Sequence, residues 1–161
     1  MKRIVRLLAA AALCLAVLPA AAAQQPNTLT RSEIEDGWIL LFDGETPFGW
    51  APRGEARWAA AGGVLTPVPG SGKGVLSTTT EFPNYRLKVD FWIDDVANSG
   101  IFLRCPTSGL IDGRNAYELN IYDRHDRWPT GSINEVARTH VTPHTTGHWN
   151  TYEVEANGPR F

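Results

Sequence analysis

The stretch "YRLKVDFWID", residues 85–94, has the most regular pattern in this chain and predicts its fold class. Every second residue is apolar, which is the period of a β-strand with one packed face and one face in solvent. The stretch is therefore expected to be an antiparallel strand over a hydrophobic core. One face would carry Leu87, Val89, Phe91 and Ile93, and the other Lys88, Asp90, Trp92 and Asp94.

The same alternation appears in further segments, separated by Gly, Pro and Asn at short intervals that are typical of all-β folds. In "GIFLRC", residues 100–105, Ile101, Leu103 and Cys105 share one face and Phe102 and Arg104 the other. No window shows a sustained helical period, so only a turn at Arg31–Asp36 is expected to be helical. The pattern predicts a sandwich of two antiparallel sheets. The expected strands are Trp38–Phe42, Trp58–Ala60, Val64–Pro67, Gly74–Ser77, Tyr85–Ile93, Gly100–Cys105, Tyr117–Tyr122 and Thr151–Ala156.

The first 23 residues are typical of a secretory signal peptide. Basic residues at Lys2, Arg3 and Arg6 precede an apolar run, and the segment ends in three alanines before Gln24. A retained membrane anchor is the alternative, because the run is nearly long enough to span a bilayer. A lipoprotein attached through Cys14 is disfavoured by the bulky Leu13 before it. We expect cleavage, with the mature protein secreted or periplasmic and not attached to a membrane.

Residues 24–35 are interpreted as a linker and residues 36–161 as one domain. The signal contains three of the 15 basic residues and none of the 17 acidic residues, so its removal takes the formal charge from −2 to about −5. A nucleic-acid partner is not expected, since it would favour a basic surface. Cys105 is the one cysteine left after cleavage, which excludes an internal disulfide.

The stretch "AYELNIYD", residues 116–123, raises the question of function. If the stretch is a strand, one of its faces carries the carboxylate of Glu118, the amide of Asn120 and the phenol of Tyr122. A solvent-exposed strand face would ordinarily carry small or positively charged residues. If three strands packed as one sheet, their polar faces would combine aromatic plates with planar hydrogen-bonding groups, which suits a sugar. A solvated face with incidental aromatics is the alternative. The gathered residues would be Asp90, Trp92, Phe102, Arg104, Glu118, Asn120 and Tyr122.

Five segments in order resemble the 3-keto-disaccharide hydrolase domain family, which is common in secreted proteins of glycan-degrading bacteria. They are "LFDGETPFGW" (41–50), "NSGIFLR" (98–104), "AYELNIYD" (116–123), "TGSI" (130–133) and "HWNTYEVEANG" (148–158). The resemblance implies a concanavalin-like jelly-roll sandwich. Because family domains continue with further strands, the chain is expected to lack its last C-terminal strands after Phe161. Asn120 and Asn134 depart from the residues that are common at these positions in the family.

The resemblance implies action on a glycoside whose sugar carries a ketone at C3. The ketone acidifies the C2 hydrogen, so a base and a positive group near the enolate oxygen are needed. Glu118 or Asp123 would be the base and Arg104 the electrostatic partner, with assistance from His125. A cross-strand salt bridge between Glu118 and Arg104 is the alternative. Trp92, Phe102 and Tyr122 would form a platform, with Asp90 and Asn120 as further substrate contacts.

The expected substrate is an oxidised, 3-keto disaccharide or glycoside, cleaved by hydrolysis or by elimination followed by hydration. No cofactor is predicted; a divalent ion on Glu118, Asp123 and a histidine is an alternative that we do not predict. Two non-enzymatic functions share the fold: a carbohydrate-binding module and a laminin-G-like protein-binding domain.

Overall fold

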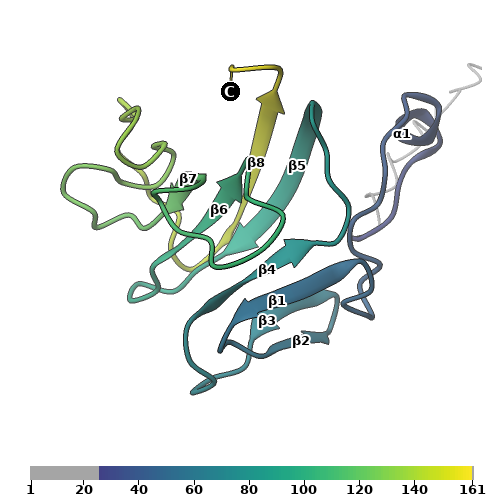
Figure 1. Ribbon diagram of the computed structural model, residues 1–161, viewed down its shortest axis with the longest axis horizontal. Coiled ribbons are helices and arrows are strands. Elements are labelled where there is room, and N and C mark those ends of the chain that lie inside the picture. Colours follow the sequence, from purple (N-terminus) through teal and green to yellow (C-terminus); the bar gives the residue numbers. More distant parts are fainter. Residues whose placement is uncertain (1–25, 161) are drawn as a thin grey trace, which may run out of the picture.

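The computed structural model describes residues 26–160, and the predicted leader at residues 1–23 lies outside them (Figure 1). The described chain is almost entirely β-structure, as the alternating pattern predicts. No helix in this part of the chain is long and apolar enough to cross a membrane. The elements are α1 (Arg31–Glu35), β1 (Trp50–Gly54), β2 (Trp58–Ala61), β3 (Val64–Pro67), β4 (Gly74–Thr78), β5 (Tyr85–Trp92), β6 (Ser99–Leu103), β7 (Tyr117–Ile121) and β8 (Trp149–Ala156).

The strands form four antiparallel pairs: β1 with β4, β2 with β3, β5 with β8, and β6 with β7. Figure 1 shows the first two pairs together in the lower part of the view and the last two side by side in the upper part. The arrangement is consistent with a jelly-roll sandwich of antiparallel β-structure, in agreement with the fold class that the sequence predicts.

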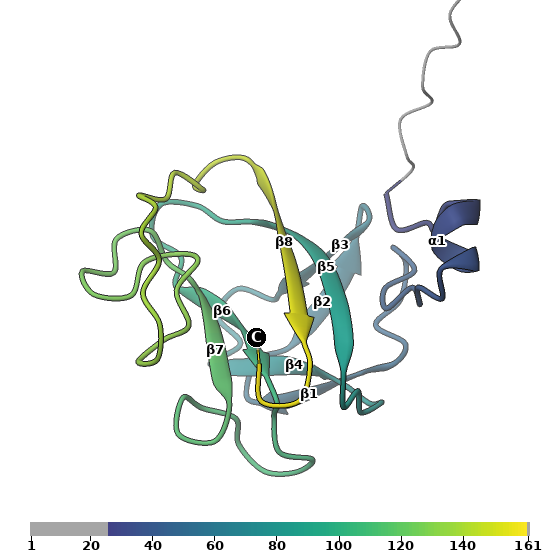
Figure 2. The ribbon, with the colours of Figure 1, turned by 90° about the horizontal axis from the view of Figure 1, so that it is seen from above.

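The short helix α1 lies beside the strand pairs at the edge of the molecule (Figure 2). Thr30 and Glu33 form a capping box, in which each side chain bonds the backbone N–H of the other residue. This local exchange explains why five residues are helical although none of them is buried. The helical turn expected at Arg31–Asp36 is thereby confirmed.

At the N-terminal end, one strand prediction is wrong and one strand was not predicted. Trp38–Phe42 is not a strand: its backbone joins no ladder, although the Leu41 carbonyl accepts a hydrogen bond of 2.6 Å from the indole N–H of Trp50. Instead, β1 is formed by "WAPRG", residues 50–54. Its Pro52 and Gly54 read as turn residues in sequence, but proline is tolerated in a strand at an edge, where no N–H is needed.

The strands β5 and β8 confirm the predicted alternation. They pair over eight residues, from Tyr85 opposite Ala156 to Trp92 opposite Trp149, and both alternate between half-buried and exposed side chains. The rings of Phe91 and Tyr152 lie 4.7 Å apart on the packed face. The Tyr152 hydroxyl donates a hydrogen bond of 2.8 Å to the Asn120 carbonyl, which connects this pair to β7.

The expected single sheet containing β5, β6 and β7 is not formed. The hydrogen-bonded partner of β5 is β8, and β6 bonds only β7 among the strands of residues 26–160. β8 matches the alternation of β5 over its whole length, so pairing the two buries one continuous face, and the other edge of β5 forms no ladder with a described strand. The polar residues of β5 therefore do not continue the polar side of β6.

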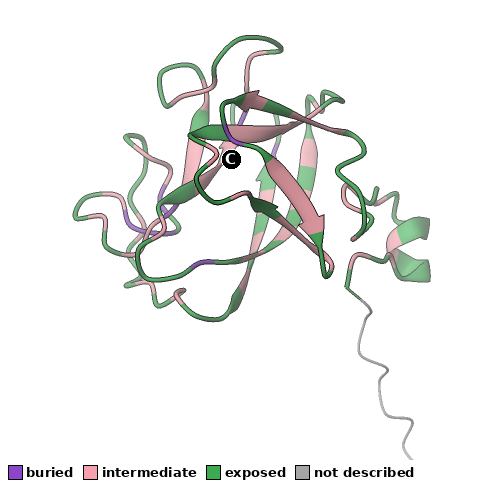
Figure 3. Ribbon diagram, turned by 90° about the horizontal axis from the view of Figure 1, so that it is seen from below, coloured by how far each residue is buried: buried purple, intermediate pink, exposed green. Residues whose placement is uncertain are grey.

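Few side chains are fully buried in the described chain, as the scarce purple in Figure 3 shows. The buried apolar residues are Ala56, Ile93, Leu103, Ile121 and Ala156. Three buried polar residues, Asn120, Thr130 and Ser132, lie in or beside β7. Much of the remaining apolar surface lines an open cavity.

Candidate active site

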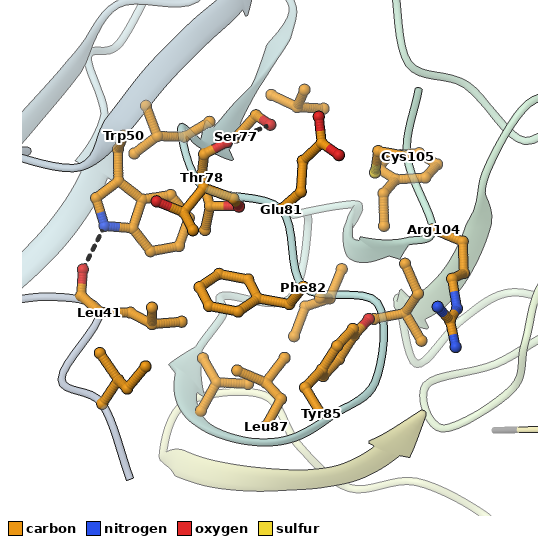
Figure 4. Close-up of a pocket in the computed structure, with 18 of the residues that line it drawn as sticks. Leu41, Trp50, Ser77, Thr78, Glu81, Phe82, Tyr85, Leu87, Arg104 and Cys105 are labelled. Carbon is orange, nitrogen blue, oxygen red and sulfur yellow. Dashed lines mark hydrogen bonds between the residues drawn. The ribbon is translucent and has the colours of Figure 1, made fainter. Parts of the chain in front are cut away.

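The cavity has a volume of about 1380 Å³ and lies against β4, β5 and β6 (Figure 4). Aromatic and aliphatic side chains form most of its wall; Figure 4 shows Trp50, Phe82, Tyr85 and Leu87 among them. Two candidate catalytic residues, Arg104 and Glu118, line this same cavity together with the candidate platform residue Phe102. The structure thus brings together three of the residues that the sequence singled out.

Glu118 is held from both its main chain and its side chain. It lies in β7 directly opposite Phe102 of β6, so a carboxylate and a flat ring project from neighbouring positions. The Asn134 side-chain amide donates a hydrogen bond of 3.1 Å to Glu118 Oε2, and the Asn134 N–H donates one of 2.8 Å to the Glu118 carbonyl. The segment "TGSIN", residues 130–134, therefore serves as a support beside β7.

The second carboxylate oxygen of Glu118 lies over Gly100. A Cβ atom built on Gly100 would be 2.6 Å from Glu118 Oε1 and 2.8 Å from its Cγ, so no larger residue fits there without displacing the carboxylate. Oε1 has no hydrogen-bond partner among the described residues. Glu118 therefore has one oxygen fixed by an amide and one able to accept a proton, which is the arrangement a general base needs.

Arg104 is anchored to the backbone at the end of β6. Its guanidinium donates hydrogen bonds to the carbonyls of Pro83 and Gly158, the latter at 2.7 Å, and to Asn84 Oδ1 at 3.5 Å. Burial raises the pKa of the neighbouring Tyr85, and the positive charge of Arg104 opposes that effect. Arg104 thus brings positive charge to the cavity wall while connecting β6 to the segments before β5 and after β8.

Asp123 lies outside the cavity wall and has a different environment. Its two oxygens accept hydrogen bonds from the N–H of Thr145 at 2.7 Å and the hydroxyl of Thr145 at 2.6 Å. Partial burial acts to raise the pKa of Asp123, but hydrogen bonds of this kind outweigh it and the pKa is lowered. A carboxylate with saturated oxygens and a lowered pKa is a poor base, so the geometry favours Glu118.

The other predicted contacts do not join this cavity. Asp90 and Trp92 have the opposite parity to Leu87 and Val89, which line the cavity, and both are exposed on the outer face of β5. Asn120 is 2% exposed, and its side-chain amide donates to the Trp128 carbonyl, so its role is structural.

Tyr122 and His125 lie together after β7, with ring centroids 6.2 Å apart. The His125 ring nitrogen Nδ1 accepts backbone hydrogen bonds from Arg127 and Trp128 at 3.2 and 3.1 Å, which shapes the loop. Within residues 26–160, no group of three His, Cys, Asp or Glu side chains is placed to hold a metal ion.

Comparison with known proteins gives the family. The model of the 3-keto-alpha-glucoside-1,2-lyase-like domain, the 3-keto-disaccharide hydrolase family, matches residues 37–161. The chain belongs to this family. Membership in the 3-keto-alpha-glucoside-1,2-lyase-like family confirms the resemblance seen in the five sequence segments and supports a carbohydrate-active function in general.

A solved structure shows the same fold as this family member. It is the crystal structure of a proposed glycosyl hydrolase from Parabacteroides distasonis, with a TM-score of 0.70 and 20% sequence identity. The match covers 83% of this chain and 70% of that chain. No curated protein sequence matches the chain.

Two residues of the candidate site were not assigned a role from sequence. Gly100 makes room for the Glu118 carboxylate, and Asn134 fixes one of its oxygens. Gly100 lies in "NSGIFLR" and Asn134 directly follows "TGSI", so the family segments contained the signal. What sequence could not show is that both segments border Glu118.

Proposed function

We propose that this protein cleaves 3-keto-glycosides, with Glu118 as the base that removes the C2 proton. The observation that carries the proposal is the Glu118 carboxylate: one oxygen is held by Asn134, the other lacks a described partner, and Phe102 lies opposite in a cavity shared with Arg104. The family name, which describes a lyase acting between C1 and C2 of a 3-keto-glucoside, supports this chemistry.

The reaction follows from the acidity of the carbon next to the ketone. Glu118 takes the C2 proton, and the C2–H electron pair forms the C2–C3 double bond of an enolate whose charge rests on the C3 oxygen. When the ketone re-forms, these electrons make a C1–C2 double bond, and the aglycone oxygen leaves from C1 and takes up the proton that Glu118 removed. Addition of water across C1–C2 completes hydrolysis; without it the product is the unsaturated sugar.

Arg104 is the proposed electrostatic partner. A guanidinium at the cavity wall stabilises negative charge that develops on the enolate oxygen, and such an interaction is strong where water is excluded. The ring of Phe102 offers a flat apolar surface to the C–H face of the sugar.

The test is release of 4-nitrophenol from a 3-keto-glucoside of 4-nitrophenol by the full chain. Glu118→Gln keeps the shape and loses the base, and should reduce kcat about 10²–10⁴-fold. The matched control is Glu153→Gln, on the outer face of β8. Full activity of Glu118→Gln would exclude this base.

Arg104 needs a separate design, because its backbone hydrogen bonds also stabilise the fold. Arg104→Lys keeps the charge and Arg104→Met removes it, so both are compared at equal folded fraction, measured by thermal unfolding. Retained activity in the lysine variant and its loss in the methionine variant would support the electrostatic role. Equal activity of the two would contradict it.

Export through the predicted leader at residues 1–23 is part of the proposal. N-terminal sequencing of the mature protein should then begin at Gln24.

A further inference from the structure

The ends of β5 and β8 carry two exposed indoles. Trp92, the last residue of β5, is the direct cross-strand partner of Trp149, the first residue of β8. Trp92 is 48% exposed and Trp149 57% exposed. Both have the outward parity of Asp90 and Thr151, so they lie on the face of the strand pair that points away from the packed side.

Two side chains directly opposite each other on neighbouring strands project from one face with Cβ atoms about 5 Å apart. The two indoles therefore lie next to each other on this exposed face and form an apolar strip. A cross-strand aromatic pair also stabilises a sheet, but that role does not by itself require half of each ring to face water.

Asp90 and Thr151, the next residue pair on the same face, provide hydrogen-bonding groups beside the indoles. The Thr151 hydroxyl donates a hydrogen bond of 2.5 Å to Asp90 Oδ1, and the other Asp90 oxygen has no partner among the described residues. A carboxylate and a hydroxyl next to flat rings match the two surfaces of a pyranose, namely its C–H face and its equatorial hydroxyls.

The surrounding charges favour a neutral ligand. Asp90 adjoins the strip and Asp94 follows Trp92 by two residues, so an anionic chain would be repelled. Farther along this face, Lys88 lies opposite Glu153 and Arg86 opposite Glu155, which leaves the apolar strip too narrow for a protein interface.

We propose that Trp92 and Trp149 form a stacking platform that binds neutral pyranoside chains, independently of the Glu118 cavity. The cavity is lined by Tyr85, Leu87 and Val89, which have the opposite parity, and by Arg86 at the far end of β5; neither indole contributes to its wall. The platform would hold the enzyme on an unoxidised glycan while the cavity acts on oxidised sugar.

The binding test uses the full chain with cellohexaose and maltohexaose as probes, measured by calorimetry, and polygalacturonate as the anionic comparison. Binding to at least one neutral chain is expected. Trp92→Ala and Trp149→Ala should each weaken it about tenfold. Phe48→Ala, which removes an aromatic side chain that is 89% exposed elsewhere, should leave it unchanged.

A second measurement needs no substitution, in case the alanine variants fold poorly. Oxidation with N-bromosuccinimide, followed by peptide mass spectrometry, should modify Trp92 and Trp149 early, and the bound glycan should protect both. Glu118→Gln should bind the glycan as the unmodified chain does, which separates this platform from the proposed catalytic function. The platform is refuted by absence of neutral-glycan binding, by equal binding in the double alanine variant, or by tighter binding of polygalacturonate.

Discussion

At the scale of single residues, two carboxylates that look equivalent in sequence have different roles because of their neighbours. Glu118 and Asp123 lie five positions apart in one segment, and either could be a base. Asp123 has both oxygens occupied by Thr145, whereas Glu118 keeps Oε1 without a described partner. The hydrogen bonds to the ionised carboxylate, more than its position in the motif, distinguish the structural Asp123 from the candidate base Glu118.

Gly100→Ala should strongly reduce turnover of the 3-keto-glucoside. The new methyl group would lie 2.6 Å from Glu118 Oε1, so the carboxylate must move, and a displacement of about 1 Å can cost about 100-fold in rate. Steady-state kinetics checks this. Gly113→Ala, at a position with no atom within 4 Å of the added carbon, is the control and should be fully active. Normal kcat in Gly100→Ala would show that the position of Glu118 does not matter.

Asp123→Asn should destabilise the fold by about 1–2 kcal/mol at neutral pH, because the hydrogen bonds to a charged oxygen are weakened. The folded-state pKa of Asp123 is lowered, so its stabilisation is present above the ordinary pKa of 3.8 and is lost as pH falls through the folded value. Urea unfolding between pH 3 and pH 7 tests the difference.

The matched control for that series is Asp95→Asn. Asp95 pairs with Arg124 at 2.9 Å, but both side chains are more than half exposed, so the change should cost less than about 0.5 kcal/mol. If the two variants lose equal stability at every pH, the assigned role of Asp123 is wrong.

At the scale of elements, side-chain bonds supply connections that strand pairing does not. The ladders join strands only two by two within residues 26–160. Tyr152 connects β8 to β7 through the Asn120 carbonyl, and Arg104 connects the end of β6 to the loops at Pro83 and Gly158. Since ladders alone leave the pairs separate, these bonds help to fix how the pairs lie against each other.

Tyr152 should ionise only at strongly alkaline pH. Burial, with a smaller effect from the charge of Asp123, raises its pKa to about 12. A raised folded-state pKa leaves stability unchanged below pH 10 and lowers it as pH rises from 10 towards 12. Absorbance titration at 295 nm should show a late component that is absent in Tyr152→Phe. Absence of this late component would contradict the burial of the Tyr152 hydroxyl.

At the scale of the whole molecule, the large cavity limits how much apolar surface is buried. Its wall includes core-facing apolar residues of several strands, such as Val75 of β4, Val89 of β5 and Ile101 of β6. Few apolar side chains of the described chain are fully buried, so much of the stabilisation that burial gives to a sandwich is not realised here.

The native protein should therefore bind the dye ANS without denaturant. Val89→Trp, which adds an indole to the cavity wall, should reduce the dye fluorescence. Val136→Trp, at a residue that is 60% exposed and outside the cavity wall, should not. Fluorescence titration at neutral pH measures both. Absence of native-state dye binding would mean that the cavity is closed in solution.

Much of the fold was predictable because strand alternation is a local property. The alternation from Tyr85 to Trp92 is visible in the sequence itself. Eight of the nine described elements fall where the sequence predicts them, with small shifts of their ends. The segment "WAPRG" was missed, since a proline in an edge strand has no local signature that separates it from a turn.

The sequence by itself determined the β-rich class, the family and the residue types of the proposed sugar site, because strand alternation and motifs are local properties of the chain. Only the tertiary structure decided that β5 pairs with β8, that Trp92 lies opposite Trp149, and that Glu118 rather than Asp123 lines the cavity with Arg104. The reason is physical. Each outcome depends on contacts between segments distant in sequence, and their pairing follows from register and burial over the whole chain.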